Sequence, residues 1–204
     1  MADLNYFSIE FEAGAELTVK GSKFIAHAAP ASDIGGAETF IAETSRTFHD
    51  ATHNCFAYKI GVGDAALFRF SDAGEPSGTA GRPILQAIEA KKLTNVALVV
   101  TRYFGGTKLG TGGLVRAYHA AALAALNHAT LVPYFSQIRL RLSFPFQFTN
   151  TVHLFLNKFQ GQVVESHFAE RTEYVIQLRS MDAGAFGKEL RDASSGRVGI
   201  EILA

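Results

Sequence analysis

The 204-residue sequence contains no tryptophan and a single cysteine, Cys55. One cysteine excludes an internal disulfide and any metal site that needs several thiolates. No apolar run approaches the roughly 18 residues that a membrane-spanning helix needs, and the first residues show no basic-then-apolar secretion signal. These absences predict a soluble, cytoplasmic protein with no membrane partner.

The formal net charge is zero, because 19 Lys and Arg residues balance 19 Asp and Glu residues. A general polyanion binder is therefore not indicated, yet the charges are unevenly distributed. Residues 1–50 hold three Lys or Arg against eight acids, a balance of −5, whereas residues 76–132 hold six against Glu89 alone, a balance of +5. Such segregation either forms a local patch for an anionic ligand or scatters over the folded surface, and both interpretations stay open.

The remaining composition is that of an ordinary globular protein, 48% hydrophobic and 19% charged. Helical and alternating spacings predict strands and helices throughout the first part of the chain. In chain order these are two strands within 15–28, a helix beginning near 33, strands at 53–60 and 66–70, a helix begun by Pro83, a strand from 96 and a helix over 112–128. The strand from residue 96 is continuously apolar to residue 100, which is typical of a strand covered on both faces.

After residue 132 the pattern resets. Residues 137–144 alternate cleanly between apolar and polar, and a helix, two strands, a second helix and a final strand follow. The order βαββαβ is that of the ferredoxin-like split unit. We therefore predict an α+β protein of two domains, residues 1–132 and residues 133–204, of which the second is ferredoxin-like.

Glycine is concentrated in two loops, the first glycine loop at residues 72–81 and the second at residues 105–113. A buried strand followed by a glycine turn and a helix N-terminus can hold an anion, because the first N–H groups of a helix are unpaired and glycine lets a ligand approach them. Tight packing of loop against strand is the alternative use of the same glycines. The predicted phosphate- or nucleic-acid-binding residues are Arg102, Lys108, Gly110, Thr111, Gly112, Gly113 and Arg116.

The first glycine loop carries four polar side chains that form a candidate second part of the site: Asp72, Glu75, Ser77 and Thr79. Asp72 and Glu75 are acid–base groups or metal ligands if they converge, and otherwise Asp72 caps its own backbone turn. Standard nucleotide fingerprints do not fit, since Thr107 precedes Lys108 and Val115 replaces the third glycine of G-x-G-x-x-G. We expect no cofactor, no metal and no catalytic residue.

A further polar cluster, His49, Asp50, His53 and Cys55, precedes the first glycine loop. It lacks the additional cysteines of a structural zinc site and the orienting signature of a Cys–His nucleophile pair. We interpret Cys55 as a small buried hydrophobe.

The segments DAGEPSGTAGRPIL and LVVTRYFGGTKLGTGGLVRAY resemble the signature of the YigZ/IMPACT family, and the upstream segment DATHNCFAY does so as well. The resemblance covers roughly residues 15–130. It implies a first domain similar to the second domain of ribosomal protein S5, and a second domain similar to the last domain of elongation factor G. Elongation factor G places these two folds consecutively, so the resemblance points toward the ribosome or RNA.

Three functions stay open. The preferred hypothesis is a non-enzymatic, translation-associated regulator that binds RNA or a ribosomal surface through the face of the glycine loops. One alternative is a protein-binding regulatory module that contacts its protein partner through the ferredoxin-like domain. The other is an enzyme acting on a small phosphorylated ligand.

Overall fold

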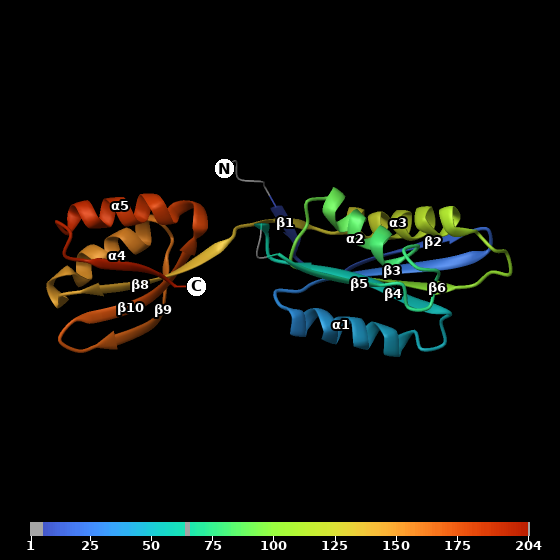
Figure 1. Cartoon of the computed structure of the whole chain (residues 1–204), viewed down its shortest axis with the longest axis horizontal. Coiled ribbons are helices and arrows are strands. Elements are labelled where there is room, and N and C mark those ends of the chain that lie inside the picture. Colours follow the sequence, from blue (N-terminus) through green and yellow to red (C-terminus); the bar gives the residue numbers. More distant parts are fainter. Residues whose placement is uncertain (1–5, 64–65, 204) are drawn as a thin grey trace. The chain divides into compact units, whose positions relative to one another are not determined.

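The computed structural model describes residues 6–63 and 66–203, and Figure 1 shows their arrangement. Up to residue 134 the elements are β1 (Tyr6–Ile9), β2 (Ala13–Val19), β3 (Ser22–Pro30), α1 (Ile34–Thr47), β4 (His53–Ile60), β5 (Leu67–Ser71), α2 (Gly81–Ala90), β6 (Val96–Tyr103), α3 (Thr111–His128) and β7 (Leu131–Tyr134). From residue 135 they are β8 (Gln137–Phe144), η2 (Phe146–Phe148), α4 (Thr149–Lys158), β9 (Gln162–Phe168), β10 (Thr172–Arg179), η3 (Ser180–Asp182), α5 (Ala183–Ala193) and β11 (Gly199–Leu203).

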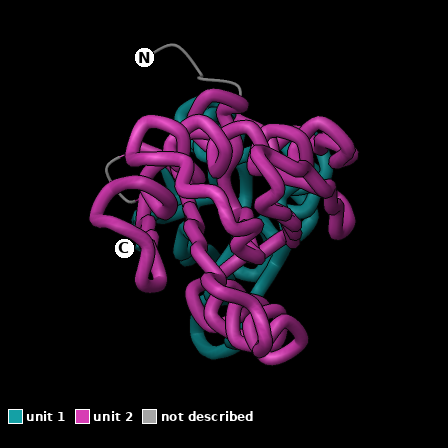
Figure 2. The backbone as a smooth tube through the Cα atoms, turned by 90° about the vertical axis from the view of Figure 1, so that its right-hand side faces the viewer, with its two compact units in different colours: residues 1–3, 135–204 teal, residues 4–134 magenta. Residues whose placement is uncertain are grey.

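The chain divides into two compact units, and the boundary lies between Tyr134 and Phe135 (Figure 2). This position is two residues beyond the 132/133 boundary expected from the sequence. Pro133 and Tyr134 belong to the first unit because β7 pairs antiparallel with β1, a strand that the sequence pattern did not predict. The expected α+β class and the division into two domains are confirmed.

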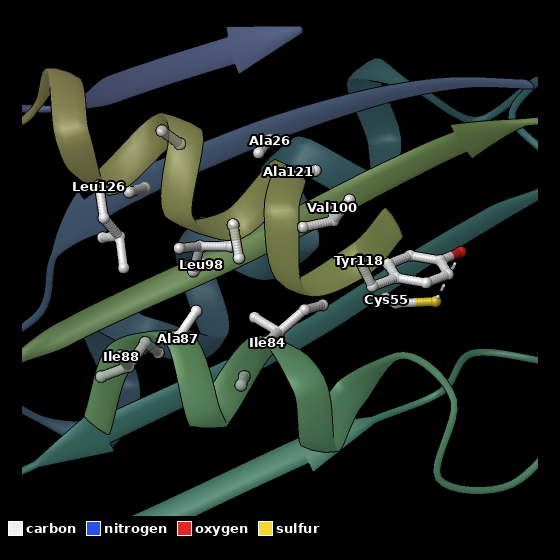
Figure 3. Close-up of a cluster of buried hydrophobic side chains, with 14 of the residues drawn as sticks. Ala26, Cys55, Ile84, Ala87, Ile88, Leu98, Val100, Tyr118, Ala121 and Leu126 are labelled. Carbon is white, nitrogen blue, oxygen red and sulfur yellow. Dashed lines mark hydrogen bonds between the residues drawn. The ribbon is translucent and has the colours of Figure 1, made fainter. Parts of the chain in front are cut away.

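A five-stranded antiparallel sheet, in the order β2-β3-β6-β4-β5, forms the centre of the first unit. Helices α2 and α3 cover one face and α1 covers the other (Figure 1). The central strand β6 is therefore buried on both faces, as its continuous apolar run predicts. Leu98 and Val100 face α2 and α3 (Figure 3), while Ala97 and Val99 face α1.

Helix α1 begins where the sequence indicates, because the side chain of Asp33 accepts a hydrogen bond from the Gly36 N–H at 2.8 Å. Ala37 and Ile41 are buried against the sheet, but Ile34, which the helical spacing also directs inward, is 44% exposed. The first turn of α1 therefore extends beyond the sheet that the later turns cover.

The second unit has a four-stranded antiparallel sheet in the order β11-β8-β10-β9. This order and the chain sequence βαββαβ are those of the ferredoxin-like fold, as expected. Helices α4 and α5 pack on one face, where Leu140, Leu142, Ile176, Phe186 and Leu190 form the centre of a separate core. The other face of the sheet is open (Figure 1). Within residues 6–63 and 66–203, no helix has the length and apolar character needed to cross a membrane.

Two of the loop glycines are required for close packing of backbone on backbone. A Cβ atom added at Gly105 would lie 1.9 Å from the carbonyl carbon of Gly21, and one at Gly81 would lie 2.7 Å from the Ser71 nitrogen. The second glycine loop thus rests directly on the β2–β3 turn, and the first rests on the end of β5. The packing alternative for the loop glycines is therefore confirmed at these two positions.

Replacing Gly105 by alanine should lower the free energy of unfolding by about 1–3 kcal/mol, because the backbone must move to admit the methyl group. We expect a value near the upper limit of this range. Urea-induced unfolding measures this effect. The matched control is Gly184→Ala in the first turn of α5, where an added Cβ meets nothing within 4 Å. That variant should unfold at the same urea concentration or slightly higher. An unchanged midpoint for Gly105→Ala would contradict the packing role.

Candidate functional site

A buried ion pair joins the first glycine loop to the end of β6, the strand that leads into the second glycine loop. Nη1 of Arg102, at the end of β6, donates to Oε1 of Glu75 in the first glycine loop at 2.6 Å. The two side chains are only 6% and 3% exposed. The guanidinium also lies near the rings of Phe24 and Phe104, 5.5 and 5.6 Å from their centroids. Its Nη2 donates to Ser22 Oγ at 3.3 Å, which links it to the start of β3.

The ion pair extends into a polar network beneath the loops. The hydroxyl of Tyr118, on α3, donates to the same Oε1 of Glu75 at 2.8 Å. Sγ of Cys55 lies 3.4 Å from that hydroxyl, as Figure 3 marks, and 3.0 Å from the backbone carbonyl oxygen of Asp72. Glu75, Arg102, Tyr118 and Cys55 come from different elements, so the network fixes the first glycine loop, β4, β6 and α3 relative to one another.

The network does not activate Cys55 as a nucleophile. Burial in the core raises the pKa of the Cys55 thiol to about 12; the Tyr118 hydrogen bond opposes this shift, and the carboxylates of Glu75 and Asp72 add to it. Burial likewise raises the pKa of the Tyr118 phenol, with Cys55 and Glu75 adding to the effect. The thiolate form, which is the reactive one, is therefore scarce at neutral pH. The interpretation of Cys55 as a buried hydrophobe is confirmed.

His53 lies at the outer edge of this network, next to Glu75. Its side chain is 20% exposed, with Nδ1 2.8 Å from the Ala73 carbonyl oxygen and Nε2 3.9 Å from Oε2 of Glu75. Asp50 instead accepts a hydrogen bond from the Tyr103 hydroxyl at 2.7 Å. Among residues 6–63 and 66–203, no three His, Cys, Asp or Glu side chains are placed to share a metal ion.

The four polar residues of the first glycine loop do not converge on one point. Asp72 accepts hydrogen bonds from the backbone N–H groups of Gly78, Ala80 and Gly81 at 2.8, 2.9 and 2.9 Å. Partial burial tends to raise the pKa of Asp72, but these three donors lower it below its usual value. Thr79 is buried and donates to the Pro76 carbonyl, whereas Ser77 is exposed. Capping of the loop backbone is therefore the structural role of Asp72.

Arg102 occupies a different place from the one that phosphate binding requires. The sequence places it at the strand end as a phosphate contact, but its guanidinium is buried and paired with Glu75. The alternation of side chains along a strand could have predicted this position. Arg102 is two residues from Val100 and four from Leu98, so it shares their inward face. Among the described residues, the buried Nε of Arg102 is left without a hydrogen-bond partner, as is Nε2 of His27. Arg102 holds the loops in place and does not face a ligand.

The other predicted binding residues lie together at the surface. Gly110, Thr111, Gly112, Lys108 and Arg116 are exposed. Gly110 precedes the first turn of α3 with φ +72°, no side chain caps this helix end, and its first turn has no acidic residue. By helix geometry the N–H groups of residues 111–113 have no intrahelical acceptor and carry partial positive charge. A Cβ added at Gly112 would lie 3.5 Å from Nη1 of Arg116, so the guanidinium lies over this turn.

The structure adds Lys20, which the sequence did not single out. Lys20 lies in the β2–β3 turn and lines the same groove as Gly113 and Arg116, and Leu109, the neighbour of Lys108, lines it too. We call Lys20, Lys108 and Arg116 the basic cluster. None of the three forms an ion pair with a described residue; in contrast, Lys23 pairs with Glu16 at 2.8 Å.

Comparison with known families accounts for most of the chain. Residues 20–126 match the model of the Impact N-terminal domain, and residues 142–197 match that of a domain of unknown function, DUF1949. The chain is 40% identical to an IMPACT family member of Thermus thermophilus over 90% of this chain and 99% of the relative. It is 30% identical to the IMPACT family member YigZ of Escherichia coli over 91% of each chain. The crystal structure of a hypothetical protein matches with a TM-score of 0.76 and 27% identity, covering 98% of both chains.

The two matched domains thus define a two-domain protein class, and the chain belongs to the IMPACT family. The Protein IMPACT of Rattus norvegicus is 33% identical over 48% of this chain and 31% of its own length. Family membership suggests a regulatory role.

Replacement of Glu75 by leucine should lower the free energy of unfolding by about 3–5 kcal/mol, because Arg102 then stays buried without its counter-charge. The double variant Glu75→Leu/Arg102→Met should recover much of this loss, because no buried charge remains. Urea unfolding of the two single variants and the double variant gives the coupling energy. The matched control is Glu38→Leu, which breaks the exposed pair with Arg69 and should cost less than about 1 kcal/mol. Equal losses for Glu75 and Glu38 would contradict the role of the buried pair.

The raised pKa of Cys55 predicts that the folded protein resists thiol reagents at pH 7–8, well below the pKa of about 12. Labelling with iodoacetamide should be slow in buffer and fast in denaturing urea, where the thiol returns to its ordinary pKa. Reactivity should rise only as the pH approaches the raised pKa or as the protein unfolds. Rapid labelling of the native protein at neutral pH would contradict the buried, protonated state.

Proposed function

We propose that this protein is a non-enzymatic, translation-associated regulator that binds RNA, free or on a ribosomal surface, through the face formed by the second glycine loop and the start of α3. The observation that carries the proposal is the basic cluster beside an uncapped helix N-terminus. Arg116 lies over the first turn of α3, Lys20 lines the same groove as Gly113, and Lys108 is two residues before Gly110. None of the three pairs with a described acid. RNA backbones present phosphates to such a surface, and cations with backbone N–H groups are their usual partners.

Phe104 adds a second element to this face. Its ring is 48% exposed and is held beside the guanidinium of Arg102, 5.6 Å from the ring centroid. Its N–H donates to Thr52 Oγ1 at 3.0 Å, which fixes the backbone at that position. An exposed aromatic ring directly before the second glycine loop is a stacking platform for an unpaired base. Arg102 then contributes by positioning Phe104 and leaves the phosphate contacts to the basic cluster.

The small number of cations limits the affinity. Three side-chain contacts on a protein of zero net charge give weak binding that depends strongly on salt. The proposal therefore describes a protein that recognises a local RNA structure or a ribosomal site, where further contacts add to those of the basic cluster.

The protein-binding alternative rests on a different surface, the open face of the four-stranded sheet in the second unit. Arg139 and Arg141 lie on this face of β8, and Arg141 donates to Glu201 of β11 at 3.1 Å. Shallow hollows of about 340 and 400 Å³ lie beside Arg141 and Arg139. A sheet covered by helices on one face only can dock a partner on the other, so this face is where a protein partner would bind.

The double variant Lys108→Ala/Arg116→Ala should weaken binding to single-stranded RNA about tenfold or more at low salt. It should also reduce the slope of log Kobs against log salt by about 1.4, since each lost phosphate contact on a single strand contributes about 0.7. Fluorescence anisotropy with a labelled RNA across a salt series measures both quantities. The control Arg46→Gln/Arg69→Gln removes the same charge from the α1 side of the sheet and should bind as the original protein does.

Equal losses in the two double variants would mean that only total charge matters, and would overturn the assignment to the basic cluster. Complete absence of RNA and ribosome binding by the unmodified protein at low salt would overturn the proposed function itself. If residues 135–204 alone bind RNA as the whole protein does, the RNA-binding surface is the open sheet face of the second unit and not the basic cluster.

A further inference from the structure

A groove of about 320 Å³ lies beside the basic cluster, between the edge strand β2 and helix α3. We call it the α3 groove. Its volume is at the small end of the range for small-molecule sites, which suits a single flat ring system with its attached group. The lining residues are Leu17, Val19, Lys20, Leu109, Gly113, Arg116, Ala117 and Ala120.

The floor of the α3 groove is aliphatic and stays open because the helix presents small residues to it. Leu17, Val19 and Leu109 pack on the core from below but remain partly exposed in the groove. Above them, Gly113, Ala117 and Ala120 follow one another at helical spacing along α3. A Cβ at Gly113 would lie 3.0 Å from that of Leu109, so even one methyl group would crowd this wall.

The rim of the α3 groove is cationic without a matching acid. Lys20 and Arg116 line it, and no carboxylate is among its lining residues. The nearest acid along β2 is Glu16, which is one residue from Leu17 and so points to the opposite face of the strand. Glu16 is moreover paired with Lys23 at 2.8 Å. An occupant of complementary charge therefore has an apolar body and an anionic group beside it.

We propose that the α3 groove takes one unpaired nucleotide of single-stranded RNA, with the base against Leu17, Val19 and Leu109 and its phosphate against Lys20 and Arg116. This inference rests on the proposed function and gives it a substrate class. In an A-form duplex the bases are stacked inside the helix and cannot enter a groove on the protein, whereas unpaired bases can be splayed out. The protein therefore prefers single strands, loops or ends over duplex RNA.

The test fills the groove without changing charge. Ala120 is exposed and lines the groove, so Ala120→Leu places a bulky side chain where the base would lie. The matched control is Ala124→Leu, one turn further along α3 and outside the groove lining. The probes are a labelled oligouridylate and a blunt RNA duplex with the same number of phosphates, followed by anisotropy at low salt. Thermal melting confirms that both variants are folded.

The unmodified protein and Ala124→Leu should bind oligouridylate about tenfold more tightly than the duplex, as expected for burial of one base against apolar side chains. Ala120→Leu should bind oligouridylate about tenfold more weakly, so that its preference over the duplex disappears. Its duplex affinity and its salt slope should stay the same, because the basic cluster is intact. The groove variant thus changes the preference, whereas Lys108→Ala/Arg116→Ala changes the salt slope.

Three outcomes overturn the inference. If Ala120→Leu binds oligouridylate as the original does while loss of the basic cluster weakens binding, the groove plays no part and the proposed function stands. If the original protein binds neither RNA at low salt, both proposals fail. If an acidic peptide with apolar side chains binds in an Ala120→Leu-sensitive manner and RNA does not, the α3 groove belongs to a protein partner.

Discussion

The structure of the first unit depends on one buried contact, the ion pair of Glu75 and Arg102. The Arg102 side chain is only 6% exposed. Its buried guanidinium needs a carboxylate beside it, since an unpaired buried charge costs several kcal/mol. Glu75 comes from the first glycine loop and Arg102 from the end of β6, so meeting this requirement fixes the first loop against the strand that leads into the second. Tyr118 and Ser22 bind the same pair and extend the constraint to α3 and β3. The first glycine loop is therefore tied to the core beneath it by side-chain contacts as well as by its backbone.

This constraint separates the charged residues of the region by role. Arg102 lies below the surface and orients the loop and Phe104, whereas Lys20, Lys108 and Arg116 lie above it and remain available to a ligand. A preorganised backbone costs less entropy on binding than a mobile loop does. A cluster of three cations gains from such preorganisation, because its few charge contacts do not also have to order the backbone.

The sequence predicted what depends on local spacing. The alternation in residues 137–144 predicted β8 with its observed bounds, and the order of elements predicted the ferredoxin-like unit. Contacts between distant residues were missed. Glu75 and Arg102 are 27 positions apart, and no periodicity connects a loop carboxylate to a strand end. Lys20 was missed for the same reason, since only the folded turn brings it beside α3. The pairing of β1 with β7 spans most of the unit, and neither short strand has a pattern of its own.

The family signature itself can be divided by what the fold requires. Gly81 and Gly105 are required by backbone contacts, Asp72 by the turn it caps, and Glu75 and Arg102 by each other. These residues identify the family because the fold requires them. For the same reason they indicate little about what the protein binds or does. Three signature residues have no such explanation: Lys108 and Thr111 are exposed, and a Cβ at Gly112 would make only an ordinary contact. Since the fold does not demand these residues, they are the part of the signature that the proposed RNA contact accounts for.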